Sequence, residues 1–300
     1  MPTTLSVTIA PNLVLCNPVM SASGTFAYGV EYEPFFDIQR LGAMVCKGTT
    51  LEPRDGNPQP RTVETAGGML NSIGLQNMGV DRLVADMAPI WAGWRLPVLV
   101  NIAGERVEDY ARLARRLDGV AGVAGIEVNI SCPNVSKGSM EFGTSASATQ
   151  EVLRGVRGAT SLPVVAKLSP NVTDITETAR AAEAGGADAI SLINTIAGMD
   201  IDAGSGRVYM GGLSGPAVKP VALRMVYRVV GAVQVPVIGC GGIATGRDAA
   251  EFLMVGATAV QVGTANFANP HACLDVLEGL VAFMEESGAE DVSQLMGAAR

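Results

Sequence analysis

The chain of 300 residues has few cysteines and a single histidine. Its five cysteines include no C-x-x-C pair, which disfavours a disulfide framework, a structural zinc site and an iron–sulfur cluster within this chain. We expect the single histidine, His271, to mark the start of the last predicted helix rather than to act in catalysis. We predict no metal site, and acid–base chemistry must fall to Cys, Lys, Asp, Glu or Tyr.

Charge and long apolar runs are also scarce. Only 17% of the residues are charged, and the net charge is −8. The sequence contains no run of like charges, which argues against a nucleic-acid or anionic-membrane surface. No stretch reaches the roughly 18 apolar residues of a membrane span, and the N-terminus lacks the order of a signal peptide. We therefore expect a cytoplasmic protein that binds neither nucleic acid nor membrane.

What the chain does have is an alternation of short apolar runs with longer segments of helical periodicity, the pattern of βα units around a parallel sheet. The predicted strands are Pro18–Ala22, Ala43–Lys47, Pro97–Ile102, Gly125–Ile130, Pro163–Leu168, Ala189–Asn194, Pro236–Gly239 and Ala259–Gly263. The predicted helices are Glu31–Arg40, Val80–Trp94, Val107–Leu117, Ala146–Ala159, Thr173–Ala184, Lys219–Val230, Gly246–Val255 and Pro270–Glu286. Eight such units predict an α/β fold, a closed (β/α)₈ TIM barrel, as one domain over residues 1–300.

An open dinucleotide-binding sheet is the alternative architecture. It would carry G-x-G-x-x-G after an early strand, whereas the first strand here ends in Ser21 to Thr25, SASGT. Two segments exceed ordinary βα loops, Gly48–Gly79 and Ala197–Val218. Because they follow the second and sixth strands, we expect these long loops to lie over the C-terminal mouth of the barrel, where active sites of this fold are found.

The C-terminal ends of the predicted strands carry polar or glycine residues that should ring this mouth. They are Ser21, Lys47, Asn101, Asn129, Lys167, Asn194, Gly241 and Gly263. Lys47 and Lys167 each end a buried strand, so each ammonium needs an anionic or electron-rich partner, either a ligand or a structural ion pair. The glycine turns after the last two strands are typical of a phosphate site, although glycines also serve tight packing.

One further segment bears on chemistry. Asn129–Asn134, NISCPN, places the thiol of Cys132 between two carboxamides on a loop after the fourth strand. Carboxamides offer donors and acceptors to an amide-rich ring, but a small core cysteine beside a turn would give the same pattern. The residues therefore fit a flavin enzyme, a phosphosugar lyase or isomerase with Lys167 as Schiff base, or a non-catalytic barrel that binds a phosphometabolite.

Taken together, the ordered motifs resemble those of the class 1 dihydroorotate dehydrogenases of pyrimidine biosynthesis over nearly the whole chain. The motifs are Asn71–Asn77, Asn129–Val135 with Gly138 and Phe142–Gly143, Lys167–Asp174, Asn194–Thr195, Gly211–Pro220, Gly241–Gly242 and Val262–Asn266. The resemblance implies oxidation of (S)-dihydroorotate to orotate, with reduction of one FMN per chain and Cys132 as the catalytic base. The membrane-bound class uses serine as the base, so Cys132 speaks against it.

The resemblance also implies residue roles. The expected FMN contacts are Ser21, Lys47, Gly48, Asn101, Asn129, Lys167, Ile193, Gly215, Gly241, Gly242, Gly263 and Thr264. The expected substrate contacts are Lys47, Asn71, Ser72, Ile73, Gly74, Leu75, Asn129, Asn134, Asn194 and Thr195. Lys167 would lie by the N1/O2 edge of the flavin, where its positive charge would raise the flavin potential.

Within class 1, the sequence is most similar to the NAD-linked branch (class 1B). That branch implies a homodimer or a heterotetramer with a partner subunit that carries FAD and a [2Fe–2S] cluster and passes electrons to NAD⁺. A fumarate-linked class 1A enzyme without such a partner is the alternative within the family.

Overall fold

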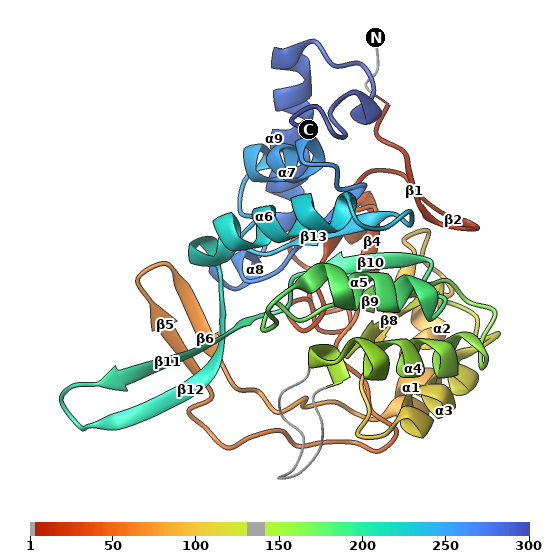
Figure 1. Ribbon diagram of the computed structural model, residues 1–300, viewed down its shortest axis with the longest axis vertical. Coiled ribbons are helices and arrows are strands. Elements are labelled where there is room, and N and C mark those ends of the chain that lie inside the picture. The colour runs from red at the N-terminus through yellow and green to blue at the C-terminus, as the bar shows by residue number, and fades with distance from the viewer. Residues whose placement is uncertain (1–3, 131–141) are drawn as a thin grey trace.

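A closed barrel of parallel strands forms the centre of the computed structural model, which describes residues 4–130 and 142–300 (Figure 1). In chain order, its strands are β3 (Val19–Ser21), β4 (Ala43–Val45), β7 (Val98–Ile102), β8 (Gly125–Asn129), β9 (Val164–Lys167), β10 (Ala189–Leu192), β13 (Val237–Cys240) and β14 (Ala259–Val262). Each strand pairs with the next, and β14 pairs with β3 to close the ring. Every residue of these eight strands is buried, so the predicted barrel is confirmed.

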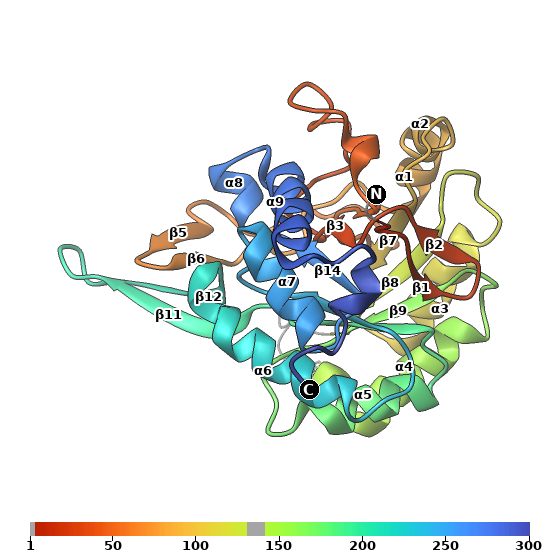
Figure 2. The ribbon, with the colours of Figure 1, turned by 90° about the horizontal axis from the view of Figure 1, so that it is seen from above.

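Helices surround this barrel, as the view from above shows (Figure 2). They are α1 (Val80–Asp86), α2 (Ala88–Trp91), α3 (Val107–Leu117), α4 (Ala146–Arg157), α5 (Ile175–Ala184), α6 (Lys219–Val230), α7 (Gly246–Met254), α8 (Ala265–Ala268) and α9 (Ala272–Ser287). The apolar residues of α3 recur every three to four positions, at Tyr110, Leu113 and Leu117, and this stripe is buried. None of the helices that the structure describes could cross a membrane.

Two of the helix predictions were wrong. The segment Glu31–Arg40 forms turns that end in a short 3₁₀ helix, Ile38–Arg40, and the ring of Tyr32 stacks on that of Phe26 with centroids 3.9 Å apart. The predicted helix Val80–Trp94 is divided at Met87 into α1 and α2. Pro89 explains the division, since it has no N–H to continue the hydrogen bonding of the preceding turn.

The two long loops fold into a second, antiparallel sheet instead of remaining irregular. Its strand order is β11 (Ile196–Asp202), β12 (Arg207–Ser214), β6 (Gly68–Asn71) and β5 (Thr62–Thr65). The hairpin β11–β12 projects away from the barrel in both ribbon views (Figures 1 and 2). A smaller hairpin near the N-terminus, β1 (Val7–Ala10) with β2 (Leu13–Leu15), packs Val7, Ile9, Leu13 and Leu15 into the core.

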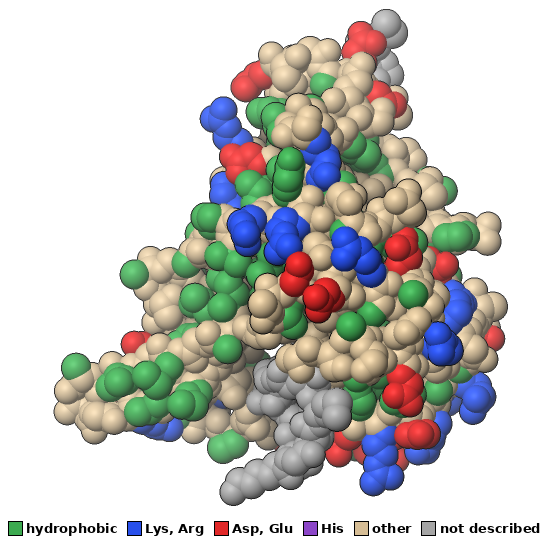
Figure 3. Space-filling view, viewed as in Figure 1, with side chains coloured by type: hydrophobic (Ala, Val, Ile, Leu, Met, Phe, Trp, Pro, Cys, Tyr) green, Lys and Arg blue, Asp and Glu red, His purple; other side chains and the backbone are tan. Residues whose placement is uncertain are grey.

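One face of the projecting hairpin is apolar. Met199 pairs with Met210 and Ile201 pairs with Val208, and because side chains alternate along a strand, all four lie on the same face. Each of them is more than half exposed, and they gather into one patch on the space-filling surface (Figure 3). We call these four residues the hairpin patch.

Candidate active site

A cavity of about 1830 Å³ lies at the C-terminal ends of the barrel strands, and residues of the antiparallel sheet line one side of it. This volume exceeds the roughly 300–1,000 Å³ of an ordinary small-molecule pocket. The strand-end residues that line it are Lys47, Asn101, Asn129, Lys167, Asn194, Gly241 and Gly263. Ser21 is the exception among the predicted ring: it is fully buried, and its hydroxyl accepts a hydrogen bond from the N–H of Val45, while its neighbours Ala22 and Ser23 line the cavity.

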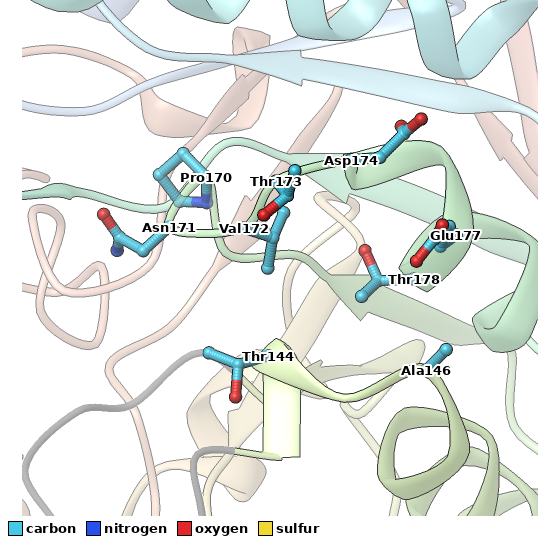
Figure 4. Close-up of a pocket in the computed structure, with 9 residues that line it drawn as sticks. All are labelled: Thr144, Ala146, Pro170, Asn171, Val172, Thr173, Asp174, Glu177 and Thr178. Atoms are coloured by element: carbon cyan, nitrogen blue, oxygen red, sulfur yellow. The ribbon is translucent and has the colours of Figure 1, made fainter.

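A second cavity of about 550 Å³ opens at the start of α5, beside Pro170 and Thr144 (Figure 4). Its charged lining residues are the acids Asp174 and Glu177. Asp174 is already engaged, because it caps α5 through the N–H of Thr176 and pairs with Arg228 at 2.8 Å. The larger cavity is therefore the better candidate for an anionic ligand.

Positive charge is concentrated in the large cavity although the whole chain carries −8. Its lining includes Lys47, Arg61 and Lys167, against one acid, Glu64. Burial lowers the pKa of Lys47, and the nearby positive charge of Arg61 lowers it further. Sequence reasoning missed Arg61, which lies in a long loop and is held by the side chain of Gln76 at 2.5 Å. The cluster favours binding of an anion.

Carboxamides line the same cavity, as predicted. The Nδ2 of Asn194 donates to the Oδ1 of Asn129 at 3.3 Å, and the Oδ1 of Asn194 accepts from the N–H of Thr195 at 2.8 Å. Asn71 lies on β6, where its Nδ2 donates to the carbonyl of Gly212 at 3.3 Å. The expected neighbours of Asn71, residues 72–75, also line the cavity. Barrel and sheet thus bring together those predicted substrate-binding residues that the structure describes.

Two buried side-chain oxygens in residues 4–130 and 142–300 have no hydrogen-bond partner, Asn101 Oδ1 and Thr65 Oγ1. Both belong to residues that line this cavity. Because nearly all buried polar groups in folded proteins are paired, these two oxygens are groups to which a bound ligand or an ordered water can donate.

Glycine is required in the turns after β12 and β13. Gly242 has a φ of +74°, and a Cβ there would lie 2.8 Å from the backbone nitrogen of Lys219 and 2.9 Å from the carbonyl oxygen of Gly215. Gly215 and Gly241 also have positive φ. Among the turn and loop hydrogen bonds of the described residues, none uses the N–H of Gly242, Gly263 or Thr264 as donor. These groups form a set of backbone donors suited to a phosphate.

The proposed base, Cys132, lies outside the described residues, as does Asn134. Among the other thiols, burial raises the pKa values of Cys46 and Cys273 to about 12 each, so neither is suited to act as a base near neutral pH. Cys240 lines the cavity and is buried. His271, predicted to mark a helix start, directly precedes α9, where its ring packs 5.9 Å from that of Phe36.

Comparisons with known proteins agree with these features. The family model described as dihydroorotate dehydrogenase matches residues 4–284. A protein from Desulforamulus reducens, named dihydroorotate dehydrogenase B (NAD(+)), catalytic subunit, is 55% identical over 291 residues, which cover 96% of each chain. A protein of the same name from Geotalea uraniireducens is 53% identical, and the alignment covers 98% of this chain and 97% of that protein. Another of that name, from Desulforudis audaxviator, is 55% identical, with 96% of this chain and 95% of that protein covered.

Proposed function

Since the chain belongs to the dihydroorotate dehydrogenase family, we propose that it oxidises (S)-dihydroorotate to orotate in pyrimidine biosynthesis, with FMN in the large cavity and NAD⁺ as final acceptor. The observation that carries the proposal is the lining of that cavity: cations, carboxamides, orphaned oxygens and glycine turns occur together. The family assignment favours this reaction over a Schiff-base lyase at Lys167.

The lining fits FMN at each of its chemical parts. The N–H groups of Gly242, Gly263 and Thr264, with the turns at Gly215 and Gly241, would hold the phosphate. Asn101, Asn129, Ile193 and Lys167 would contact the ring system, together with Lys47 and Gly48; Ser21 would act from just beneath the cavity. Bound FMN would supply the acceptor for the hydride that leaves C6 of the substrate.

The substrate is an anion with a planar ring of amide groups, and the cavity offers matching partners. Lys47 would favour its carboxylate by charge. The carboxamides of Asn71, Asn129 and Asn194, with Thr195, Asn134 and residues 72–75, would hold the ring, because a carboxamide can meet an N–H and a C=O at once. These contacts would fix which face of the ring meets the catalytic base.

Cys132 would remove the proton from C5 of the substrate, and the Sγ atom would hold that proton while orotate forms. A thiolate can act as base near neutral pH only where its surroundings help it ionise. We expect Cys132→Ser to slow flavin reduction by dihydroorotate far more than it weakens orotate binding, because a hydroxyl is a much weaker acid. Stopped-flow reduction and orotate titration measure the two effects, and equal losses in both would contradict the base role.

The relatives are named as catalytic subunits, which supports a partner subunit here as well. We propose a partner that carries FAD and a [2Fe–2S] cluster, in a heterotetramer built on a homodimer of this chain. The hairpin patch supports association, because a connected apolar face on a protruding element is typical of interfaces. Copurification from the native source, with flavin and iron analysis, tests the partner. Reduction of fumarate instead of NAD⁺ by the purified assembly would contradict the NAD-linked assignment.

A further inference from the structure

Two charged side chains are buried in the described part of the chain, Glu127 and Lys167, and both lie inside the barrel. Lys167 lines the large cavity, whereas Glu127 lies beneath the lining and is fully buried. Gln261 lies between them: its Nε2 donates to Glu127 Oε1 at 2.7 Å, and its Oε1 accepts from Lys167 Nζ at 2.6 Å. A carboxylate beneath the cavity is thus linked by one carboxamide to a cation of the proposed flavin site.

Glu127 also holds a second carboxamide. Its Oε2 accepts from Asn101 Nδ2 at 2.7 Å, and its Oε1 accepts a further bond from Ser191 Oγ at 2.9 Å. Because Nδ2 of Asn101 is taken by Glu127, the orphaned Oδ1 of Asn101 lies at the cavity wall, where a Cβ on Gly48 would be 3.1 Å from it. By holding Nδ2, the Glu127 carboxylate fixes the Asn101 side chain so that Oδ1 rather than Nδ2 is the atom available to a ligand.

A carboxylate differs from a carboxamide in accepting at both ends. In the hydrogen-bonded chain, both Asn101 and Gln261 direct their NH₂ groups toward Glu127. An amide at position 127 would present an NH₂ to one of them. Either Asn101 would turn over and place a donor at the cavity wall, or Gln261 would turn over and place its NH₂ against the Lys167 ammonium.

Stability alone does not explain an acid at this position. A barrel interior is ordinarily filled by layers of apolar side chains, and burial of a carboxylate is unfavourable unless every lone pair is used. Glu127 accepts hydrogen bonds from three side chains, Asn101 on β7, Ser191 on β10 and Gln261 on β14. Asn101 itself lines the cavity, and Gln261 holds Lys167, which also lines it. The network ends at the cavity, so its effect is expected there.

We propose that Glu127 is a positioning residue that fixes the orientation of Asn101 and Gln261, so that the cavity floor presents an acceptor at Asn101 and a held ammonium at Lys167. This inference rests on the proposed function, since FMN is the ligand that meets this floor. Because Glu127 is buried beneath the cavity lining, it would touch neither FMN nor substrate.

The test compares Glu127→Gln with the swapped variant Glu127→Gln/Gln261→Glu. In the swapped variant, the carboxamide at position 127 can accept from Asn101 and donate to the carboxylate at position 261, which in turn accepts from Lys167. The orientation of Asn101, the bond to Lys167 and the net charge of the network are all retained, and the carboxylate moves from position 127 to position 261. A matched control is Glu183→Gln, which removes a carboxylate that accepts from the N–H groups of Gln234 and Val235 away from the cavity.

The readouts are the dissociation constant of FMN, from fluorescence quenching, and the midpoint potential of the bound flavin. Loss of one hydrogen bond to a charged group corresponds to about tenfold to hundredfold weaker FMN binding for Glu127→Gln, with a shifted potential. The swapped variant should restore the FMN affinity of wild type, and Glu183→Gln should leave both affinity and potential unchanged. A purely structural role would not give this pattern of loss and rescue.

Wild-type FMN affinity and potential in Glu127→Gln would overturn the inference while leaving the proposed function intact. Failure of the wild-type protein to bind FMN would overturn both. If Glu127→Gln does not fold, a swapped variant that folds and binds FMN with wild-type affinity supports the inference, and a swapped variant that is also unfolded assigns Glu127 to folding and overturns it.

Discussion

The substitution Gly242→Ala tests the proposed phosphate site. A Cβ at Gly242 would lie 2.8 Å from the Lys219 nitrogen, whereas ordinary contact begins at 3.4 Å, so the backbone must move by about 0.6 Å. A hydrogen bond of about 2.9 Å that lengthens by this amount is no longer effective. Loss of one charge-assisted bond, about 1.5–3 kcal/mol, predicts FMN binding that is about tenfold to hundredfold weaker.

Gly119→Ala is the matched control. Gly119 has a φ of +72°, close to that of Gly242, but a Cβ there would meet nothing within 4 Å. Both variants therefore bear a similar conformational cost of about 1 kcal/mol, and only Gly242→Ala disturbs the turn. Titration of apoprotein with FMN, followed by fluorescence quenching, measures both. FMN affinity equal to wild type in Gly242→Ala would refute the phosphate assignment.

Three further predictions concern stability, thiols and assembly. Burial pushes the pKa of Asp248 upward, but Lys219 and the Ala244 N–H hold it below the ordinary value, so the stabilisation by this carboxylate is present above about pH 4 and is lost as the pH falls further. Between pH 5 and pH 3, the urea midpoint of Asp248→Asn should therefore fall by less than the urea midpoint of the wild type. An equal fall in both proteins would contradict this. Iodoacetamide at pH 8 should leave Cys46 unmodified by mass spectrometry, since burial raises its pKa to about 12; rapid labelling would contradict its burial. Met210→Asp should shift the sedimentation of the chain toward monomer by charging the hairpin patch, and an unchanged profile would exclude this patch from the interface.

The barrel could be predicted from the sequence because each strand is a short apolar run bounded by turns, and its burial on all sides leaves little ambiguity. The antiparallel sheet could not. Its strands are half exposed, rich in glycine, and pair residues far apart in the chain, such as Gly212 with Asn71. Pairing of this kind is set by tertiary contacts rather than by local pattern.

The site was predictable where polar residues end buried strands, as at Lys47, Asn101 and Lys167. Arg61 was missed because nothing local distinguishes a loop arginine that points into a cavity. Glu127 was missed although the sequence contained a signal: an acid in the middle of the apolar run Gly125–Ile130 must be buried and paired. The identity of its partners from three other strands required the closed barrel.

Anaerobic titration of the purified chain with dihydroorotate tests the central claim most directly. The proposed function predicts a yellow protein with one FMN per chain, whose flavin absorbance is bleached as dihydroorotate is added and orotate is formed. A colourless protein that cannot be loaded with FMN, or a loaded protein whose spectrum dihydroorotate leaves unchanged, would contradict it.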